Sequence, residues 1–155
     1  LVHSPGELSS ALKAASGEAL NYFGDDGVYL EQYIDKARHV EVQILGDHQG
    51  NIIHLFDRDC TIQRRNQKVI EEAPVTFLPV DKRHEIMNAA LLIAQSLNYS
   101  SAGTIEFLVD ENGNYFFLEI NPRLQVEHAV TELVTGTDIV KEQLNGVLNQ
   151  LTLDI

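Results

Sequence analysis

Hydrophobic residues recur at helical spacing in one long stretch of the chain. They fall at positions that one face of a helix would share: Ile86, Ala89, Ala90, Ile93, Ala94 and Leu97. This spacing predicts a helix over residues 81–98. A first helix is expected to begin near Ser4 and to end at Gly24, because Ser4 and Glu7 have the capping-box spacing. A last helix is expected over residues 138–149.

Other apolar runs have the length of strands and predict hairpins. Residues 28–34 form a short candidate strand, and residues 38–45 and 51–57 a longer hairpin. A second hairpin is expected where residues 104–109 and 115–118 flank the turn sequence Asp-Glu-Asn-Gly-Asn, since Asn-Gly favours tight hairpin turns. With Asn112 and Gly113 central in that turn, Glu106 falls directly opposite Glu119. Antiparallel strands with separate helices indicate an α+β fold.

Two facing carboxylates need a positive partner. Like charges opposite each other on paired strands repel, and Asn121 shares the strand face of Glu119 because side chains alternate. Glu106, Glu119 and Asn121 therefore offer three oxygen ligands around one point, a set that suits Mg²⁺ or Mn²⁺. The alternative is a pair of solvated carboxylates on an exposed sheet face.

The alternation continues past this strand. Arg123, Gln125 and Glu127 follow at every second position. Arginine can hold a small planar oxyanion through two parallel hydrogen bonds, and a neighbouring carboxylate could act as a base. The sequence therefore predicts an anion site beside the metal site.

Three motifs, in this order, closely resemble the biotin carboxylase domain of biotin-dependent carboxylases, a member of the ATP-grasp superfamily. They are residues 38–43 (RHVEVQ), 58–68 (RDCTIQRRNQK) and 119–128 (EINPRLQVEH). The resemblance extends over about residues 2–151 and implies an ATP-grasp fold, an antiparallel sheet with flanking helices. It implies that residues 1–26 end a lid subdomain, that residues 27–155 belong to the large C-terminal subdomain, and that the Gly-rich loop lies upstream.

The resemblance also implies nucleotide contacts. The hinge residues Glu31, Gln32, Tyr33 and Ile34 would hold the adenine, while His39, Gln63 and Asn66 would face the ribose and phosphates. Two positions depart from the family pattern: Gln32 replaces a common basic residue, and Asn66 replaces a common histidine and cannot become cationic. Glu106 and Glu119 would contact ATP through one or two metal ions.

For the chemistry, the resemblance implies that Lys68, Arg123, Gln125 and the backbone of Val126 hold bicarbonate. Glu127 would act as general base and Arg123 would stabilise the biotin anion, so the implied catalytic residues are Arg123, Glu127 and Lys68. Without the resemblance, a single lysine such as Lys68 would more often be expected to be a solvated side chain. The implied partners are ATP, bicarbonate, a biotin carboxyl carrier protein or domain and a carboxyltransferase, and a homodimer is an option.

Charge and cysteine content limit the partners and the kind of compartment expected for this chain. A net charge of −12 argues against nucleic acid or an anionic membrane as partner, since both favour a basic face. Cys60 cannot form an internal disulfide because it is the only cysteine, and it is expected to be a packed residue. His128 is expected to be structural. The chain opens with Leu1, so we expect a piece of a longer protein from the cytoplasm or a mitochondrial matrix.

Two other classes stay open. Another ATP-grasp ligase, joining a carboxylate to an amine, would share Glu106, Glu119 and Asn121 but would not require the pattern at residues 123–127. A non-catalytic nucleotide-binding module would keep the fold without turnover. For the chain alone, weak nucleotide binding and no turnover are expected.

Overall fold

The computed structural model describes residues 1–147 and divides the chain into two compact units, Leu1–Asp35 and Lys36–Ile155. The first unit holds the 3₁₀ helix η1 (Pro5–Glu7) and helix α1 (Leu8–Phe23). Helix α1 ends at Gly24, which has the left-handed φ of 74° typical of a helix C-cap. The end of α1 at Gly24 is as predicted, but the expected start near Ser4 is wrong for the α-helix, because residues 5–7 form η1 and α1 begins at Leu8.

The capping pair forms only in part. The Ser4 hydroxyl donates to the Glu7 carboxylate at 2.9 Å, and Glu7 accepts from the backbone N–H of His3 rather than from that of Ser4. The strand expected over residues 28–34 is wrong. Val28, Tyr29 and Leu30 are exposed, and within the described residues no strand pairs with this segment, so the extended backbone lacks the ladder that would make it a strand.

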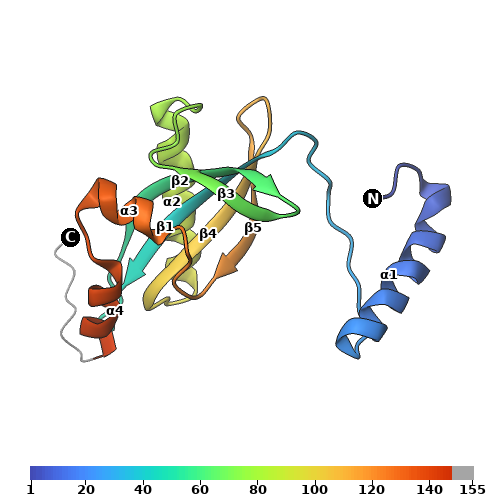
Figure 1. Cartoon of the computed structure of the whole chain (residues 1–155), viewed down its shortest axis with the longest axis horizontal. Helices are drawn as coiled ribbons and strands as arrows, with labels where there is room; N and C mark the ends of the chain where they lie inside the picture. The colour runs from blue at the N-terminus through green and yellow to red at the C-terminus, as the bar shows by residue number, and fades with distance from the viewer. Residues whose placement is uncertain (148–155) are drawn as a thin grey trace. The chain divides into compact units, whose positions relative to one another are not determined.

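The second unit is built on a five-stranded antiparallel sheet (Figure 1). Its strands are β1 (Arg38–Gly46), β2 (Ile52–Arg64), β3 (Gln67–Glu72), β4 (Ser101–Val109) and β5 (Tyr115–Asn121). They lie in the order β3-β2-β1-β4-β5. The two predicted hairpins are present, and the expected α+β class is confirmed, but β3 was not predicted from the apolar pattern.

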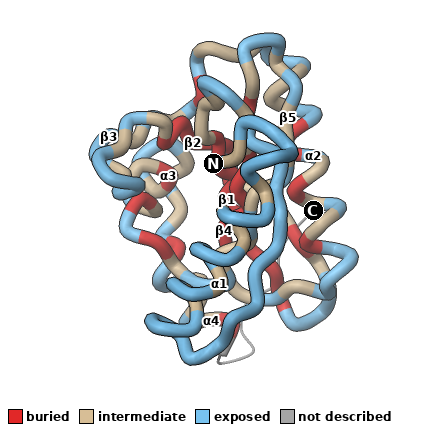
Figure 2. The backbone as a smooth tube through the Cα atoms, turned by 90° about the vertical axis from the view of Figure 1, so that its right-hand side faces the viewer, coloured by how far each residue is buried: buried red, intermediate tan, exposed pale blue. Residues whose placement is uncertain are grey.

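One face of the sheet carries the hydrophobic core. Helix α2 (Val80–Ser96) packs there against β1 and β2, in the place where residues 81–98 predicted a helix. Val40, Val42 and Ile44 alternate along β1 and are buried against the α2 residues Ile86 and Ala90. Figure 2 shows the buried positions gathered in the central strands and on one side of α2.

The opposite face of the same strands is polar. His39, Glu41 and Gln43 alternate with the core residues of β1, and Thr104 and Glu106 do so on β4, yet all but His39 are fully buried. Helices α3 (His128–Thr135) and α4 (Ile139–Val147) belong to this side. Helix α3 was not predicted. The last two positions of the helix expected over residues 138–149 lie outside the described residues.

A bulge in β2 decides which of its residues face the core. Ile44 pairs with His54 but Val42 pairs with Asp57, so β2 carries one extra residue there, and Phe56 takes a positive φ of 64°. The extra residue turns Asp57 toward α2, where its carboxylate accepts two hydrogen bonds of 2.7 Å from Arg83. The next residue, Arg58, consequently points to the polar face.

Candidate functional site

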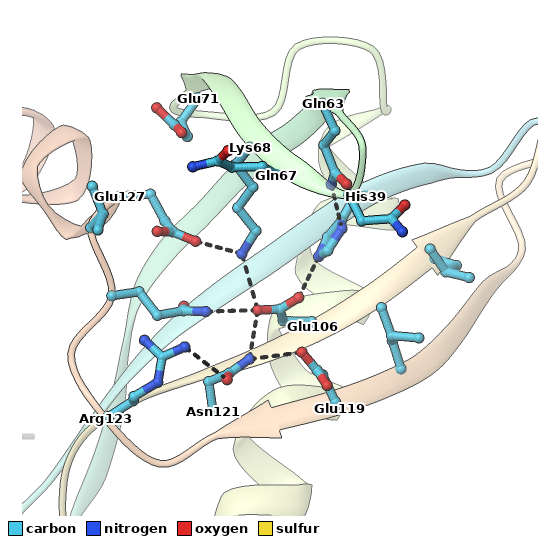
Figure 3. A pocket seen from close by; sticks show the side chains of 15 residues that line it. His39, Gln63, Gln67, Lys68, Glu71, Glu106, Glu119, Asn121, Arg123 and Glu127 are labelled. Carbon is cyan, nitrogen blue, oxygen red and sulfur yellow. Dashed lines mark hydrogen bonds and ion pairs between the residues drawn. The ribbon is translucent and has the colours of Figure 1, made fainter. Parts of the chain in front are cut away.

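A pocket of about 620 Å³ opens on the polar face of the sheet. Among its lining residues are His39, Gln63, Asn66, Lys68, Glu106, Glu119, Asn121, Arg123, Gln125, Val126 and Glu127. Every residue that the sequence assigned to the metal, the bicarbonate and the phosphates thus meets in one place (Figure 3).

The hairpin of strands β2 and β3 brings Lys68 to the pocket. Strands β2 and β3 are joined by a two-residue turn in which Arg65 and Asn66 both have positive φ, 53° and 61°. This is the backbone of a type I′ turn, which asparagine tolerates well. The turn sets Lys68 opposite Gln63, and Lys68 reaches over the polar face from there.

Glu106 lies at the centre of the pocket's hydrogen bonds. Its carboxylate accepts from His39 Nε2 at 2.6 Å, Gln125 Nε2 at 2.8 Å and Asn121 Nδ2 at 2.8 Å. Burial alone would raise the pKa of Glu106, but the hydrogen bonds from His39 and Gln125 and the charges of His39 and Lys68 lower that pKa to about 2. Glu106 is therefore a carboxylate at neutral pH.

Lys68 links the carboxylates of the site. Its ammonium forms ion pairs with Glu41 and Glu127 and lies 3.1 Å from Glu106 Oε1. Burial alone would lower the pKa of Lys68, but the hydrogen bonds and charges of these carboxylates raise it. A solvated Lys68, which spacing alone would favour, is therefore wrong.

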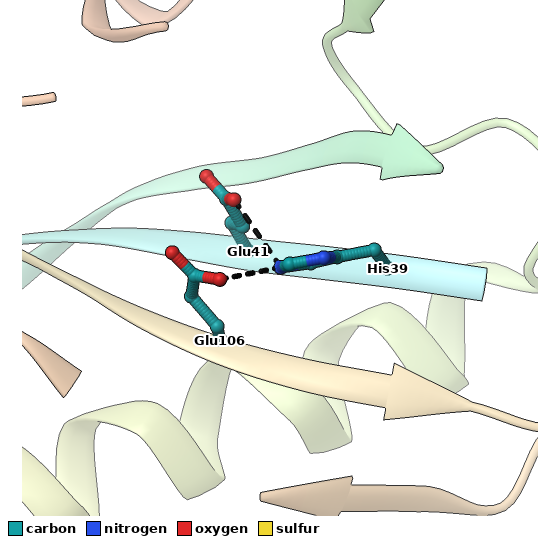
Figure 4. A group of neighbouring side chains, drawn as sticks. All are labelled: His39, Glu41 and Glu106. Carbon is teal, nitrogen blue, oxygen red and sulfur yellow. Dashed lines mark hydrogen bonds and ion pairs between the residues drawn. The ribbon is translucent and has the colours of Figure 1, made fainter. Parts of the chain in front are cut away.

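His39 is held between two carboxylates (Figure 4). Its Nε2 lies 2.6 Å from Glu106 and 3.3 Å from Glu41. Burial would lower the pKa of His39, yet the hydrogen bonds and charges of Glu106 and Glu41 outweigh it and raise the pKa to about 9. The other ring nitrogen, Nδ1, lies 2.9 Å from the Gln63 amide, whose orientation sets which partner donates.

The predicted metal ligands face one another. Asn121 Nδ2 donates to Glu106 at 2.8 Å and to Glu119 at 3.1 Å, while Asn121 Oδ1 lies 3.5 Å from Arg123 Nη2. The neutral amide thus supplies N–H donors to both facing carboxylates but no positive charge. A half-turn of the amide would present its oxygen instead, and two carboxylates plus one amide oxygen are a donor set that a hard divalent cation accepts. The residues fit such an ion.

Glu127 and its neighbours close one side of the pocket. Gln125 and Glu127 are buried and line the pocket, whereas Val126, which also lines it, is 90% exposed. Arg123 lines the rim. His128 Nδ1 contacts the carbonyl oxygen of Gln125 at 2.7 Å, which fits the structural role expected for His128.

The sequence reasoning missed Glu41 and Arg58. Both are fully buried, and they pair across β1 and β2 with 3.1 Å between Arg58 Nη2 and Glu41 Oε2. The strict polar alternation of His39, Glu41 and Gln43 along β1 could have revealed Glu41. Arg58 gave no such signal, because its direction depends on the bulge.

The charges of the buried cluster balance. Glu41, Glu106 and Glu127 are matched by Lys68, Arg58 and a protonated His39. Cys60 is also buried here, and burial raises the pKa of its thiol, as expected for a packed cysteine.

The predicted adenine contacts, residues 31–34, lie in the first unit of the chain and stay a prediction. Ile34 is partly buried and its three predecessors are exposed. Among residues 1–147, every helix is too short or too polar to cross a lipid bilayer.

Comparisons with known proteins found a matching family and several similar proteins. The family described as "Carbamoyl-phosphate synthase L chain, ATP binding domain" matches residues 1–153. A biotin carboxylase of Nostoc sp. is 54% identical over 144 residues, 93% of this chain and 32% of that protein.

Two solved structures are also similar. The Campylobacter jejuni biotin carboxylase in complex with β,γ-ATP has a TM-score of 0.93 at 43% identity, over 99% of this chain and 34% of that one. The biotin carboxylase domain dimer of Hydrogenobacter thermophilus 2-oxoglutarate carboxylase, in complex with MgADP, ADP and bicarbonate, has a TM-score of 0.88 at 45% identity, over 97% and 33%. The chain spans about a third of each of these relatives.

Proposed function

The chain belongs to the family of the carbamoyl-phosphate synthase L chain ATP-binding domain, and on that premise we propose that it is the part of a biotin carboxylase that holds the metal, the ATP phosphates and bicarbonate. Its resemblance to biotin carboxylases and its ATP-grasp fold are confirmed. The observation that carries the proposal is the position of Lys68, beside Glu106 and Glu127 in a single pocket.

In this proposal Glu106, Glu119 and Asn121 hold Mg²⁺ or Mn²⁺. The ion supplies charge neutralisation at the ATP phosphates when it is bound. His39, Gln63 and Asn66 face the ribose and phosphates, and Glu31, Gln32, Tyr33 and Ile34 hold the adenine. The similar Hydrogenobacter thermophilus structure contains MgADP and bicarbonate, which supports this assignment.

Bicarbonate binds between Arg123, Gln125, Lys68 and the backbone of Val126. Glu127 takes the bicarbonate proton, and the freed oxygen attacks the γ-phosphorus of ATP. A new P–O bond forms to bicarbonate while the bond between the γ-phosphorus and the bridging oxygen breaks, so the products are carboxyphosphate and ADP. Lys68 holds the Glu127 carboxylate toward the anion.

Carboxyphosphate then breaks its C–O bond to give CO₂ and phosphate. The phosphate takes the proton from the ureido nitrogen of biotin, and the resulting biotin anion, stabilised by Arg123, attacks CO₂. Biotin is supplied on a carrier protein or domain and passes its carboxyl group to a carboxyltransferase. In this proposal the longer protein works in the cytoplasm or in a mitochondrial matrix, either as a single copy or as a homodimer.

The test compares this chain with a version extended at both ends, using ADP release with and without bicarbonate and free biotin. Bicarbonate-dependent release by the extended protein alone is the expected result. ATP cleavage by the extended protein that requires an amine and another carboxylate would assign a different ATP-grasp ligase. Nucleotide binding without cleavage would assign a non-catalytic module. Turnover by this chain alone would refute the expected inactivity of the isolated piece.

A further inference from the structure

Arg58 occupies an unusual position for an arginine. Its side chain is fully buried between the polar face of the sheet and helix α3. The guanidinium donates from Nη1 to Gln43 Oε1 at 2.7 Å and from Nη2 to Glu41 Oε2 at 3.1 Å. Its remaining contacts run to two threonine hydroxyls, Thr104 on β4 at 3.2 Å and Thr131 on α3 at 2.9 Å.

These contacts join four elements through one rigid group. A guanidinium has its donors in a fixed planar fork, so the acceptors around it are held in a fixed mutual geometry. A buried charge without partners is costly, and this cost keeps all of the contacts formed together. The strands β1, β2 and β4 and the helix α3 are therefore tied at one point beneath the pocket.

Within residues 1–147, Arg58 hydrogen-bonds to none of the proposed bicarbonate ligands, but it contacts Glu41 and Thr131, which adjoin Lys68 and Glu127. Glu41 Oε2 accepts from Arg58, while Glu41 Oε1 pairs with the Lys68 ammonium. Thr131 lies one helical turn after Glu127, the residue that immediately precedes α3. Arg58 is thus linked to Lys68 through the Glu41 carboxylate and to Glu127 through helix α3.

We propose that Arg58 is a positioning residue that fixes the Lys68–Glu127 pair by holding Glu41 on one side and Thr131 of α3 on the other. This inference rests on the proposed function for its kinetic consequence. If the pair shifts, Glu127 no longer meets the bicarbonate proton in the reactive geometry, and a misplacement of about 1 Å can cost on the order of 10²-fold in rate.

The test uses the longer protein and the change Thr131→Val, which removes the hydroxyl that Arg58 contacts while keeping the size of the side chain. Thr135→Val is the matched control, because Thr135 lies one turn later on α3 and bonds to the Thr131 carbonyl oxygen rather than to Arg58. Arg58→Lys is the second variant, since one ammonium cannot hold Glu41 and Thr131 in the geometry of the fork.

The expected result is a kcat for bicarbonate-dependent ATP cleavage, per folded molecule, that is about tenfold to a hundredfold lower in Thr131→Val. The KM for MgATP should stay within about twofold in this variant, as expected for an interaction used only in the chemical step. Thr135→Val should leave both constants within about twofold. A purely structural role would lower the melting temperature of Thr131→Val but not its kcat per folded molecule, and that outcome would overturn the proposal.

A second readout does not depend on activity. In crystal structures of the Thr131→Val and Arg58→Lys variants, the Glu127 carboxylate should move away from Lys68 by about 1 Å or more. An unmoved Glu127 in both variants would overturn the proposal. If the unmodified protein shows no bicarbonate-dependent cleavage, the proposed function fails, and these structures still decide whether Arg58 positions the pair.

Discussion

Glu106 lies directly opposite Glu119 across strands β4 and β5. Two facing carboxylates repel each other, and in this structure the amide of Asn121 bridges them by donating to both. The three side chains come from one hairpin, so a local piece of sequence builds the whole candidate cation site. A cation that binds between Glu106 and Glu119 must therefore displace the Asn121 N–H groups from the two carboxylates.

Removing one carboxylate of this site should weaken cation binding. Glu119→Gln keeps the shape of the side chain but deletes a charged oxygen ligand, so the affinity for Mn²⁺ should fall about tenfold or more, equivalent to at least about 1.4 kcal/mol. Electron paramagnetic resonance of free Mn²⁺ measures the change. Glu111→Gln, an exposed change at the tip of the same hairpin, should leave the affinity unchanged, and equal losses in the two variants would count against the assigned site.

The raised pKa of His39 makes the stability of the metal-free protein depend on pH. Because the folded-state pKa of about 9 lies above the ordinary value of 6.5, the charged ring contributes fully below pH 6.5 and its contribution is lost as the pH rises through 9. The loss should be about 1–3 kcal/mol.

Urea unfolding at pH 6.5 and 9.5 measures this loss, which should shrink in His39→Gln. A nuclear magnetic resonance titration checks its cause, since Glu106→Gln should lower the pKa of His39 by removing the negative charge that the ring contacts at 2.6 Å. A His39 ring that titrates near its ordinary value in the unmodified protein would refute both expectations.

Two glycines should respond in opposite directions to alanine. A Cβ on Gly46 would press against the Tyr99 carbonyl oxygen and lie 3.1 Å from the Ser100 Cα, so Gly46→Ala should destabilise the sheet unit by about 1–3 kcal/mol. Gly17 lies inside α1 with open space around it, so Gly17→Ala should stabilise the helix by about 0.5–1 kcal/mol.

Thermal unfolding measures the first change, and the helical circular dichroism signal measures the second. A Gly46→Ala protein that melts at the unmodified temperature would show that the strand end and the Tyr99 backbone can separate without cost.

The sequence correctly predicted that Glu106 pairs with Glu119. The prediction assumed that Asn112 and Gly113 are central in the turn and that the ladder is unbroken, and neither assumption holds. The loop is symmetric about Asn112, since Val109 pairs with Tyr115, and an unbroken ladder would set Glu106 opposite Leu118. A bulge at Leu118 adds the residue that brings Glu119 into register. The prediction was right because two departures from the simple hairpin cancel.

Other features needed tertiary information. The bulge in β2 interrupts the alternation of inward and outward side chains, so the sequence pattern does not show that Arg58 points to the polar face. Strand β3 is a short edge strand without an apolar run. The apolar residues 28–30 satisfied the strand pattern, yet a strand also requires a neighbour to pair with. The pocket residues of β5 and the loop after it were predictable because they follow one another at every second position from Glu119 to Glu127. His39, Gln63 and Lys68 come from other strands, and only the family resemblance pointed to them.

The proposed role of Glu127, activation of bicarbonate beside Lys68, is tested by Glu127→Gln in the longer protein. Glu71→Gln is the control, since it removes the same charge from the lining of the same pocket. We expect Glu127→Gln to abolish bicarbonate-dependent ATP cleavage while the Kd for MgATP stays nearly unchanged, and Glu71→Gln to retain cleavage. Full cleavage by Glu127→Gln, or a loss of MgATP affinity as large as the loss of cleavage, would contradict this role.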